Sequence, residues 1–466
     1  MVDVLQRSTP AEPSADLLEE TALAPLRRTG PGYYLLILVL LGLVGLGAYA
    51  YSIQLRRGLA VTGMAATADK VMWGLYITNF VFFIGISHAG TLISAMLRIS
   101  KAGWRTPITR MAEFITVVAL LVGALFPIFD LGRPDRMLNV IEYGRWPSPI
   151  LWDFFAISTY LVGSVLYLYL PLIPDLATCR DRLAGSLSRR KAWFYRTLSL
   201  GWTGSSEQKR NLAAALGVMM IVIIFVAVSV HTVVSWIFAM TLRTGWNTAV
   251  FGIYFVAGAI FSGIATLIIV MAVLRRAYHL ERYITVRQFV NLGYLLAALA
   301  MIMLYFNVSE LVTAGYKLEG SAPIYLGQIF TGSFAPMYWF YIFAGLLLPG
   351  LVMLFRRTRT IMVVVITAIL VDVSMWLERF IIVVASLRVP QMPYPDPARY
   401  FPTWIELAIS GGSLALFALL IAIFVKVFPV LSIWEIREHE ETLLAPTALS
   451  VPAPIGRPSV ADVIGP

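Results

Sequence analysis

Four ionisable side chains of this sequence lie inside long apolar runs or at their edges. His88 and His231 each follow several apolar residues, and Asp130 and Asp153 flank a polar segment that contains Arg133. A charge at the centre of a bilayer costs about 3 to more than 10 kcal/mol, so such groups usually face a bundle interior or a wet cavity. An imidazole and a carboxylate within hydrogen-bond reach of a substrate can accept its protons. Proton transfer is therefore the chemistry that these residues could perform.

Each of these residues also has a structural explanation. Asp130 and Asp153 could cap helices or pair with Arg133. His88 and His231 could each form an interhelical hydrogen bond, which contributes about 0.6 kcal/mol on average in membrane proteins. Structural pairing and a proton-accepting site both stay open for any one residue, but the four together favour a site.

A second charged group lies further along the chain. Asp372 and Arg379 are two helical turns apart on one face, with Glu378 beside Arg379. Such groups could neutralise each other as buried ion pairs, or they could conduct protons, because acid–base chains in membranes do both. The two explanations are equally open. The candidate proton-path residues are Asp372, Glu378, Arg379, Glu310 and Glu113.

Long apolar segments must position all of these side chains. A bilayer core of about 30 Å is crossed by roughly 20 helical residues, and the chain is 59% hydrophobic and 13% charged. A spanning β-barrel would need short alternating strands instead. The sequence therefore predicts an all-α polytopic membrane protein with ten transmembrane helices. They are expected near residues 33–53, 71–97, 110–130, 150–172, 212–241, 248–275, 287–314, 335–355, 360–386 and 404–428.

The basic residues are distributed unevenly between the two sides of the expected membrane spans. The net charge is +10, and most of the 36 Lys and Arg fall on one side of the expected spans, many of them between residues 180 and 210. By the positive-inside rule this places both termini in the cytoplasm of a multi-pass protein. Anionic lipid headgroups of the bilayer account for the basic balance, and we expect no nucleic-acid partner.

The two ends of the chain and its cysteine content limit the function further. Residues 1–32 are polar and lack the pattern of a cleavable signal, so we expect a flexible cytoplasmic arm. Residues 429–466 are expected to form a cytoplasmic tail that is disordered or clasps a partner. Cys179 is the only cysteine, which excludes an iron–sulfur cluster or a four-cysteine zinc site in this chain. We also expect no haem and no metal site.

An internal repeat divides the spans into two groups. Residues of the second and sixth expected spans match at one constant offset, and four spans separate them, so the repeat is parallel. We therefore predict two four-helix bundles, residues 71–241 and 248–386, with peripheral helices at 33–53 and 404–428. The matching pairs are Trp73 with Phe251, Gly74 with Gly252, Tyr76 with Tyr254, Gly85 with Gly263 and Arg98 with Arg276.

The two halves differ where the polar residues lie. His88 aligns with Thr266, and Asp153 aligns with Phe340. Shared residues can be explained by packing, whereas the unshared polar residues need another reason. The difference predicts a single site, in the first bundle.

Quinol oxidation fits a site of imidazole and carboxylate groups. Each quinol releases two protons with two electrons, so His and Asp side chains could accept the protons while an external redox centre takes the electrons. A secondary transporter, which also has repeats and midplane charges, and a bare membrane anchor are the alternatives. The transporter would need matched broken helices, and the anchor leaves the unshared polar groups unexplained.

Three stretches carry a resemblance to a known family. They are WGLYITNFVFFIGISHAGTLISAMLR at 73–98, FPIFDLGRPDR at 126–136 and SPILWDFF at 148–155. Together they resemble the NrfD-like family of quinone-interacting membrane subunits, to which the polysulfide reductase membrane subunit belongs. Within that family, the length and the flanking helices look closest to the ActC subunit of bacterial alternative complex III.

The resemblance implies a function and a set of partners. It implies a menaquinol-binding pocket in the first bundle near the periplasmic face of the bacterial inner membrane, an iron–sulfur protein docked there, a homologous membrane subunit and c-type cytochrome subunits. Menaquinol would be held without a covalent bond, and proton translocation could accompany its oxidation. Carried onto this sequence, the candidate site residues are His88, Asp130, Asp153 and His231, with Arg133 as an orienting or docking residue.

Overall fold

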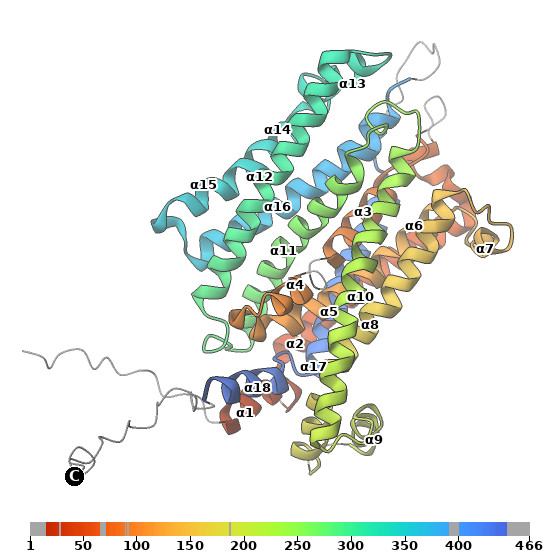
Figure 1. The fold of residues 1–466 in the computed structure, drawn as a ribbon. Coiled ribbons are helices and arrows are strands. Elements are labelled where there is room, and N and C mark those ends of the chain that lie inside the picture. The colour runs from red at the N-terminus through yellow and green to blue at the C-terminus, as the bar shows by residue number, and fades with distance from the viewer. Residues whose placement is uncertain are drawn as a thin grey trace, which may run out of the picture.

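The computed structural model describes residues 15–27, 29–65, 71–88, 90, 93–185, 188–390 and 400–444. Every regular element among these residues is a helix (Figure 1). Nine helical segments in this part of the chain are long and apolar enough to cross a bilayer, and α3 (Leu75–His88) is a shorter apolar helix. The protein is therefore an all-α polytopic membrane protein, as its sequence predicts. The nine segments are Pro31–Val61, Gly103–Asp130, Pro149–Arg182, Ser206–Ala239, Phe251–Ala277, Val286–Lys317, Ala335–Leu354, Ile361–Ala385 and Trp404–Val427.

The second expected span differs most from its expectation. The sequence predicts one helix over residues 71–97; in the structure the α-helical geometry of α3 ends at His88, Gly90 and Ile93 are π-helical, and α4 (Ser94–Ile99) follows. Between them, Gly90 packs so closely on α5 (Thr106–Gly123) that a Cβ atom there would overlap the carbonyl oxygen of Ala112. The first bundle thus has a backbone change at the residue that carries its buried imidazole.

The helices form two packed groups that share an interface. In the first group α3 and α5 pack with α8 (Pro149–Arg182) and α10 (Ser206–Ala239). In the second, α11 (Phe251–Ala277) packs with α12 (Val286–Lys317) and α16 (Ile361–Phe380), and also contacts α3 and α10. Trp376 of α16 donates its indole N–H to Asn79 of α3 at 2.8 Å, which ties the two groups together.

One segment of the second group carries a change of helical pitch. Residues Ala335–Leu354 comprise α14 (Ala335–Phe340), a π-helical segment Tyr341–Leu347 and α15 (Leu348–Leu354). A second π-helical segment, Ile381–Ala385, continues α16. π-helical turns are rare and often occur at functional sites because they re-aim side chains.

The peripheral helices α2 (Pro31–Arg57) and α17 (Trp404–Val427) pack along each other. A Cβ atom on Gly412 of α17 would lie only 2.9 Å from the Cα atom of Gly47 of α2. Small residues that allow such backbone contact are typical of helix association in membranes, where lipid is as apolar as the side chains.

Both described ends of the chain lie at one end of the molecule, with α9 (Arg189–Leu198), and opposite α7 (Asn139–Glu142) and α13 (Ala322–Phe330) (Figure 1). We call these the α1/α18 end and the α7/α13 end. The N-terminal arm is expected from the sequence to be flexible, but it contains the helix α1 (Ala15–Arg27). The side chains of Leu18, Ala22 and Leu23 are buried and hold this helix against the rest of the protein.

The tail likewise contains a helix, α18 (Ile433–Leu444). Glu19 of α1 forms ion pairs with Arg182 of α8 and Arg437 of α18. The two terminal helices are therefore packed parts of the fold. The arm before residue 15 and the tail after residue 444 lie outside the described residues.

Candidate functional site

His88 is the last residue of α3 and is fully buried. Its Nε2 atom lies 2.5 Å from the carbonyl oxygen of Ala227 in α10, and its Nδ1 atom lies 3.2 Å from the carbonyl oxygen of Ile84. A carbonyl oxygen only accepts hydrogen bonds, whereas a neutral imidazole has a single N–H. The protonated ring would donate to both carbonyl groups, whereas the neutral ring can donate to only one of them.

His231 of α10 lies directly against His88. The two ring centroids are 3.7 Å apart, and the ring of Tyr160 from α8 lies 4.9 Å from that of His88. Within the described part of the chain, His231 Nδ1 is buried without a hydrogen-bond partner. A buried polar atom without a partner costs about 1 to 3 kcal/mol, and that cost needs a reason such as a ligand or a transferred proton.

Asp153 lies on α8 toward the α7/α13 end. It is 7% exposed, and its Oδ1 atom has no hydrogen-bond partner among the described residues. Tyr160 lies two helical turns further along the same face, about 10 Å away at 1.5 Å per residue. The structure thus brings His88, His231 and Tyr160 together and places Asp153 above them on a shared face.

The second bundle contains another buried polar network. Glu378 of α16 accepts a hydrogen bond from the Tyr254 hydroxyl at 2.7 Å and pairs with Arg379 at 2.6 Å. The Tyr254 and Tyr341 hydroxyls are 3.2 Å apart. Arg379 lies over the Phe255 ring, and its positive charge acts on His231 of the first bundle. Arg379 therefore pairs with Glu378 in the second bundle and is near enough for its charge to act on His231 in the first.

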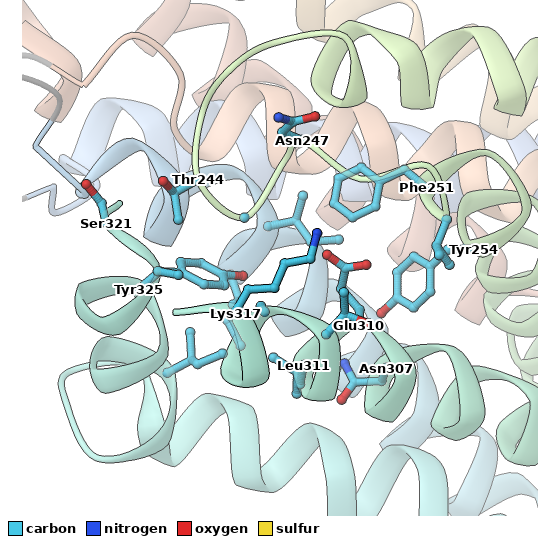
Figure 2. A pocket seen from close by; sticks show the side chains of 18 of the residues that line it. Thr244, Asn247, Phe251, Tyr254, Asn307, Glu310, Leu311, Lys317, Ser321 and Tyr325 are labelled. Carbon is cyan, nitrogen blue, oxygen red and sulfur yellow. The ribbon is translucent and has the colours of Figure 1, made fainter. Parts of the chain in front are cut away.

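A cavity of about 510 Å³ opens beside this network (Figure 2). Glu378, Tyr254 and Tyr341 line it together with Glu310, whose carboxylate accepts a hydrogen bond from the Thr248 hydroxyl at 2.6 Å. Two of the five expected proton-path residues, Glu310 and Glu378, thus face one cavity at the α7/α13 end of the second bundle.

The comparison with known proteins decides the family. The family described as "Polysulphide reductase, NrfD" matches residues 63–391. This chain belongs to the NrfD family.

The relatives of this NrfD chain are membrane subunits of oxidoreductases. A protein assigned as a membrane subunit of dimethyl sulfoxide reductase in Halobacterium salinarum is 27% identical over 84% of the chain and 90% of the relative. A selenate reductase subunit of Mesobacillus selenatarsenatis is 24% identical over 85% of the chain and 94% of the relative. The menaquinone reductase integral membrane subunit of Nitratidesulfovibrio vulgaris is 22% identical over 83% of the chain and 89% of the relative.

Asp130 of the NrfD chain lies in a cluster of its own rather than beside the histidines. The buried carboxylate of Glu406 in α17 acts on it electrostatically, and its Oδ1 atom is buried without a partner in the described structure. Beside it, the Tyr76 hydroxyl donates to Gln54 Oε1 at 2.5 Å. The Tyr400 hydroxyl donates to Glu406 Oε1 at 2.5 Å.

Sequence reasoning missed Gln54, Tyr76, Tyr400 and Glu406 as members of this cluster. A signal existed for Glu406 alone, because it is the third residue after Thr403 and completes a capping box at the start of α17.

Arg133 lies outside both clusters at the surface of the α7/α13 end. It forms a bidentate ion pair with Asp135, at 2.8 and 3.0 Å, and both side chains are more than half exposed. The hydrogen bonds from Arg133 hold the pKa of Asp135 below its usual value. The structure therefore does not bring Arg133 into contact with the buried histidines.

Of the other three proton-path candidates, Arg379 pairs with Glu378 beside the cavity, whereas Asp372 and Glu113 lie apart from it. Asp372 accepts a hydrogen bond from the Thr266 hydroxyl at 2.8 Å in the second bundle. Glu113 accepts one from Ser94 at 3.0 Å and lies 3.7 Å from Arg98 toward the α1/α18 end. The five candidates thus divide among three places in the fold.

Proposed function

We propose that this chain is the quinol-oxidising membrane subunit of a respiratory or photosynthetic oxidoreductase complex, and that it binds menaquinol in the first bundle. The observation that carries the proposal is the convergence of His88, His231 and Tyr160 from three helices, with buried atoms on His231 and Asp153 that have no partner among the residues that the structure describes. The names of two relatives, a menaquinone reductase subunit and a menaquinol oxidoreductase subunit of Archaeoglobus fulgidus, support the choice of substrate.

The proposed reaction separates protons from electrons. The quinol headgroup loses two protons and two electrons, and it leaves as the quinone. His88 accepts one proton and then donates hydrogen bonds to the Ala227 and Ile84 carbonyl oxygens. Asp153 accepts the other proton. Both electrons pass to an iron–sulfur protein docked at the α7/α13 end.

The proposal also includes the orientation of the chain in the membrane. Positive charges on α9 and at the end of α8 support a cytoplasmic α1/α18 end, because basic residues are retained on the cytoplasmic side. The site would then lie toward the periplasmic face of the bacterial inner membrane. Membership of alternative complex III in an ActC-like position, with c-type cytochrome and homologous membrane partners, stays a prediction, as does proton translocation through the bundles.

The test compares two Asp→Asn substitutions on the same helix. Asp153→Asn removes the proposed proton acceptor, while Asp181→Asn changes a surface residue that pairs with Arg180 at the other end of α8. We expect Asp153→Asn to lower quinol oxidation by the isolated complex about 10²- to 10⁴-fold, the usual contribution of a general base. Asp181→Asn should retain native turnover.

The outcome also separates the alternatives. Equal turnover in both variants, with intact assembly, would remove Asp153 from the reaction. Solute uptake by vesicles that contain this chain alone would instead favour a secondary transporter. Native turnover in every first-bundle variant would leave the chain as a membrane anchor.

A further inference from the structure

The cavity of the second bundle has the size and lining of a ligand site. Its volume of about 510 Å³ falls within the roughly 300 to 1,000 Å³ of typical ligand pockets, which are mostly apolar with a few converging polar groups. Phe251, Tyr254, Tyr325 and Glu310 point into one space between α11, α12 and α13 (Figure 2). None of the proposed first-bundle site residues lines it.

The charges around the cavity favour a neutral ligand. Glu378 at its base is already neutralised by Arg379 at 2.6 Å. Glu310 accepts a hydrogen bond from the Thr248 hydroxyl at 2.6 Å, and Lys317 lines the cavity at an exposed position. Glu319 lines the cavity as well, but it is exposed, where water screens its charge. Among the charged residues that line the cavity, Glu378 is the buried one, and its charge is already paired, so the deep part of the cavity favours a neutral ligand over an ion.

The rings around the cavity favour a flat aromatic ligand. Aromatic side chains attract other rings through offset-stacked and edge-to-face contacts, which add about 0.5 to 1.5 kcal/mol beyond area burial. Hydroxyl groups are available on both sides: Tyr254 and Tyr341 form one pair, and the Tyr338 hydroxyl donates to Asn307 Oδ1 at 2.9 Å. Their protons are committed to these bonds, but the hydroxyl oxygens can still accept from a ring hydroxyl, and the amide N–H groups of Asn307 can donate to a ring carbonyl oxygen.

The rim of the cavity reaches the exposed face of a spanning helix. Thr313 and Ala314 of α12 line it, and Thr313 is exposed. Leu242, which is 91% exposed, lines another part of the rim. A headgroup with a long apolar tail could therefore enter from the lipid while its tail stays in the bilayer.

We propose that this cavity is a second binding site, for the neutral aromatic headgroup of a quinone or quinol. The choice of ligand class rests on the proposed function, while the site itself rests on the cavity, its rings and the Glu378–Arg379 ion pair. The chain would then hold two headgroups, one in each bundle.

The test counts binding sites. A fluorescent hydroxyquinoline N-oxide, which mimics a quinone headgroup, is titrated into the isolated complex that contains the full chain. Ala314→Trp fills the cavity from its rim. Val312→Trp, on the same helix but 63% exposed and outside the cavity lining, is the matched control. Asp153→Asn reports on the first bundle.

We expect two probe molecules per native chain, two in Val312→Trp, and one each in Ala314→Trp and Asp153→Asn. Equal probe binding in native protein and Ala314→Trp, with loss in Asp153→Asn, would overturn the second site and leave the first-bundle proposal intact. Loss of all binding in Ala314→Trp with no change in Asp153→Asn would support the cavity and overturn the first-bundle site. Absence of saturable binding to native protein would overturn both.

Discussion

His88 and His231, which lie far apart in the chain, place their ring centroids 3.7 Å apart in the interior of the first bundle. Two imidazoles at this distance cannot both carry a proton cheaply, because like charges in a buried site disfavour each other. The pair therefore holds at most one added proton at a time. His88 is the better holder, since both of its nitrogens face carbonyl oxygens.

Replacing His88 with Gln should lower the turnover number for quinol oxidation. The amide cannot accept a proton at neutral pH, and we expect a decrease of about 10²- to 10⁴-fold in kcat. Steady-state kinetics of the isolated complex would separate this decrease in kcat from any change in KM. His279→Gln, at an exposed loop position, should leave both constants unchanged. A His88→Gln variant that keeps kcat within about twofold of native, far less than a general base contributes, would exclude His88 as the proton acceptor.

Replacing Asp175 with Asn should destabilise the protein. Arg110 and Asp175 form a fully buried ion pair at 2.9 Å. Removal of one partner leaves an uncompensated buried charge, which costs about 3 to 5 kcal/mol. Thermal unfolding in detergent would show the loss as a lower Tm. The double variant Arg110→Met with Asp175→Leu should recover most of the stability, because it removes both charges. A double variant as unstable as the single one would mean that packing, rather than charge, dominates at this position.

The docking of α18 should weaken in acid. Burial raises the pKa of Glu435, but Arg98 and Arg105, at 2.5 and 2.9 Å, outweigh burial and hold it below the ordinary value of 4.5. A carboxylate with a depressed pKa contributes stability above its ordinary pKa and loses that contribution as the pH falls through the depressed value. We therefore expect α18 to be protected from protease at pH 7 and increasingly cleaved below about pH 4.5.

Glu435→Gln is the control for this pH dependence. It should be cleaved faster than native protein at pH 7, because the ion pairs with Arg98 and Arg105 are absent, and its cleavage should vary little between pH 7 and pH 4. Cleavage of native protein that is independent of pH would contradict the assignment.

Leucine at Gly412 should separate α2 from α17. A side chain at this position would meet the backbone of Gly47, with a Cβ to Cα distance of 2.9 Å. Overpacking of this kind costs roughly 1 to 3 kcal/mol. Gly411→Leu is the matched control, since no atom lies within 4 Å of a Cβ atom there. The Tm in detergent should fall for Gly412→Leu only; equal values for the two variants would show that the close contact does not limit stability.

Sequence patterns predicted the helical class and the positions of most spans because apolar length alone determines which segments cross a bilayer. They also identified His88 and His231 as buried polar residues. The same patterns could not show that the two rings touch, because the contact depends on the relative rotation and depth of α3 and α10. The end of α3 at His88 was also missed, since the apolar composition continues to residue 97.

The distribution of the acidic residues shows the same limit. Glu310 and Glu378 face one cavity, whereas Glu113 pairs with Arg98 in the first bundle. The sequence showed that these acidic residues lie in the expected spans. It could not show their partners, which come from helices distant along the chain. Glu406 was missed because its closest partner, Tyr400, comes from the segment before α17 and its neighbour Asp130 comes from the first bundle.

The ion pairs of Glu435 have a consequence for biosynthesis. Arg98 and Arg105 are made early, whereas Glu435 is among the last residues of the described chain. During translation both arginines must remain hydrated or held by other groups until α18 leaves the ribosome. The first bundle is thus completed by α18, and a chain that lacks residues 433–444 would leave Arg98 and Arg105 without this buried partner at the α1/α18 end.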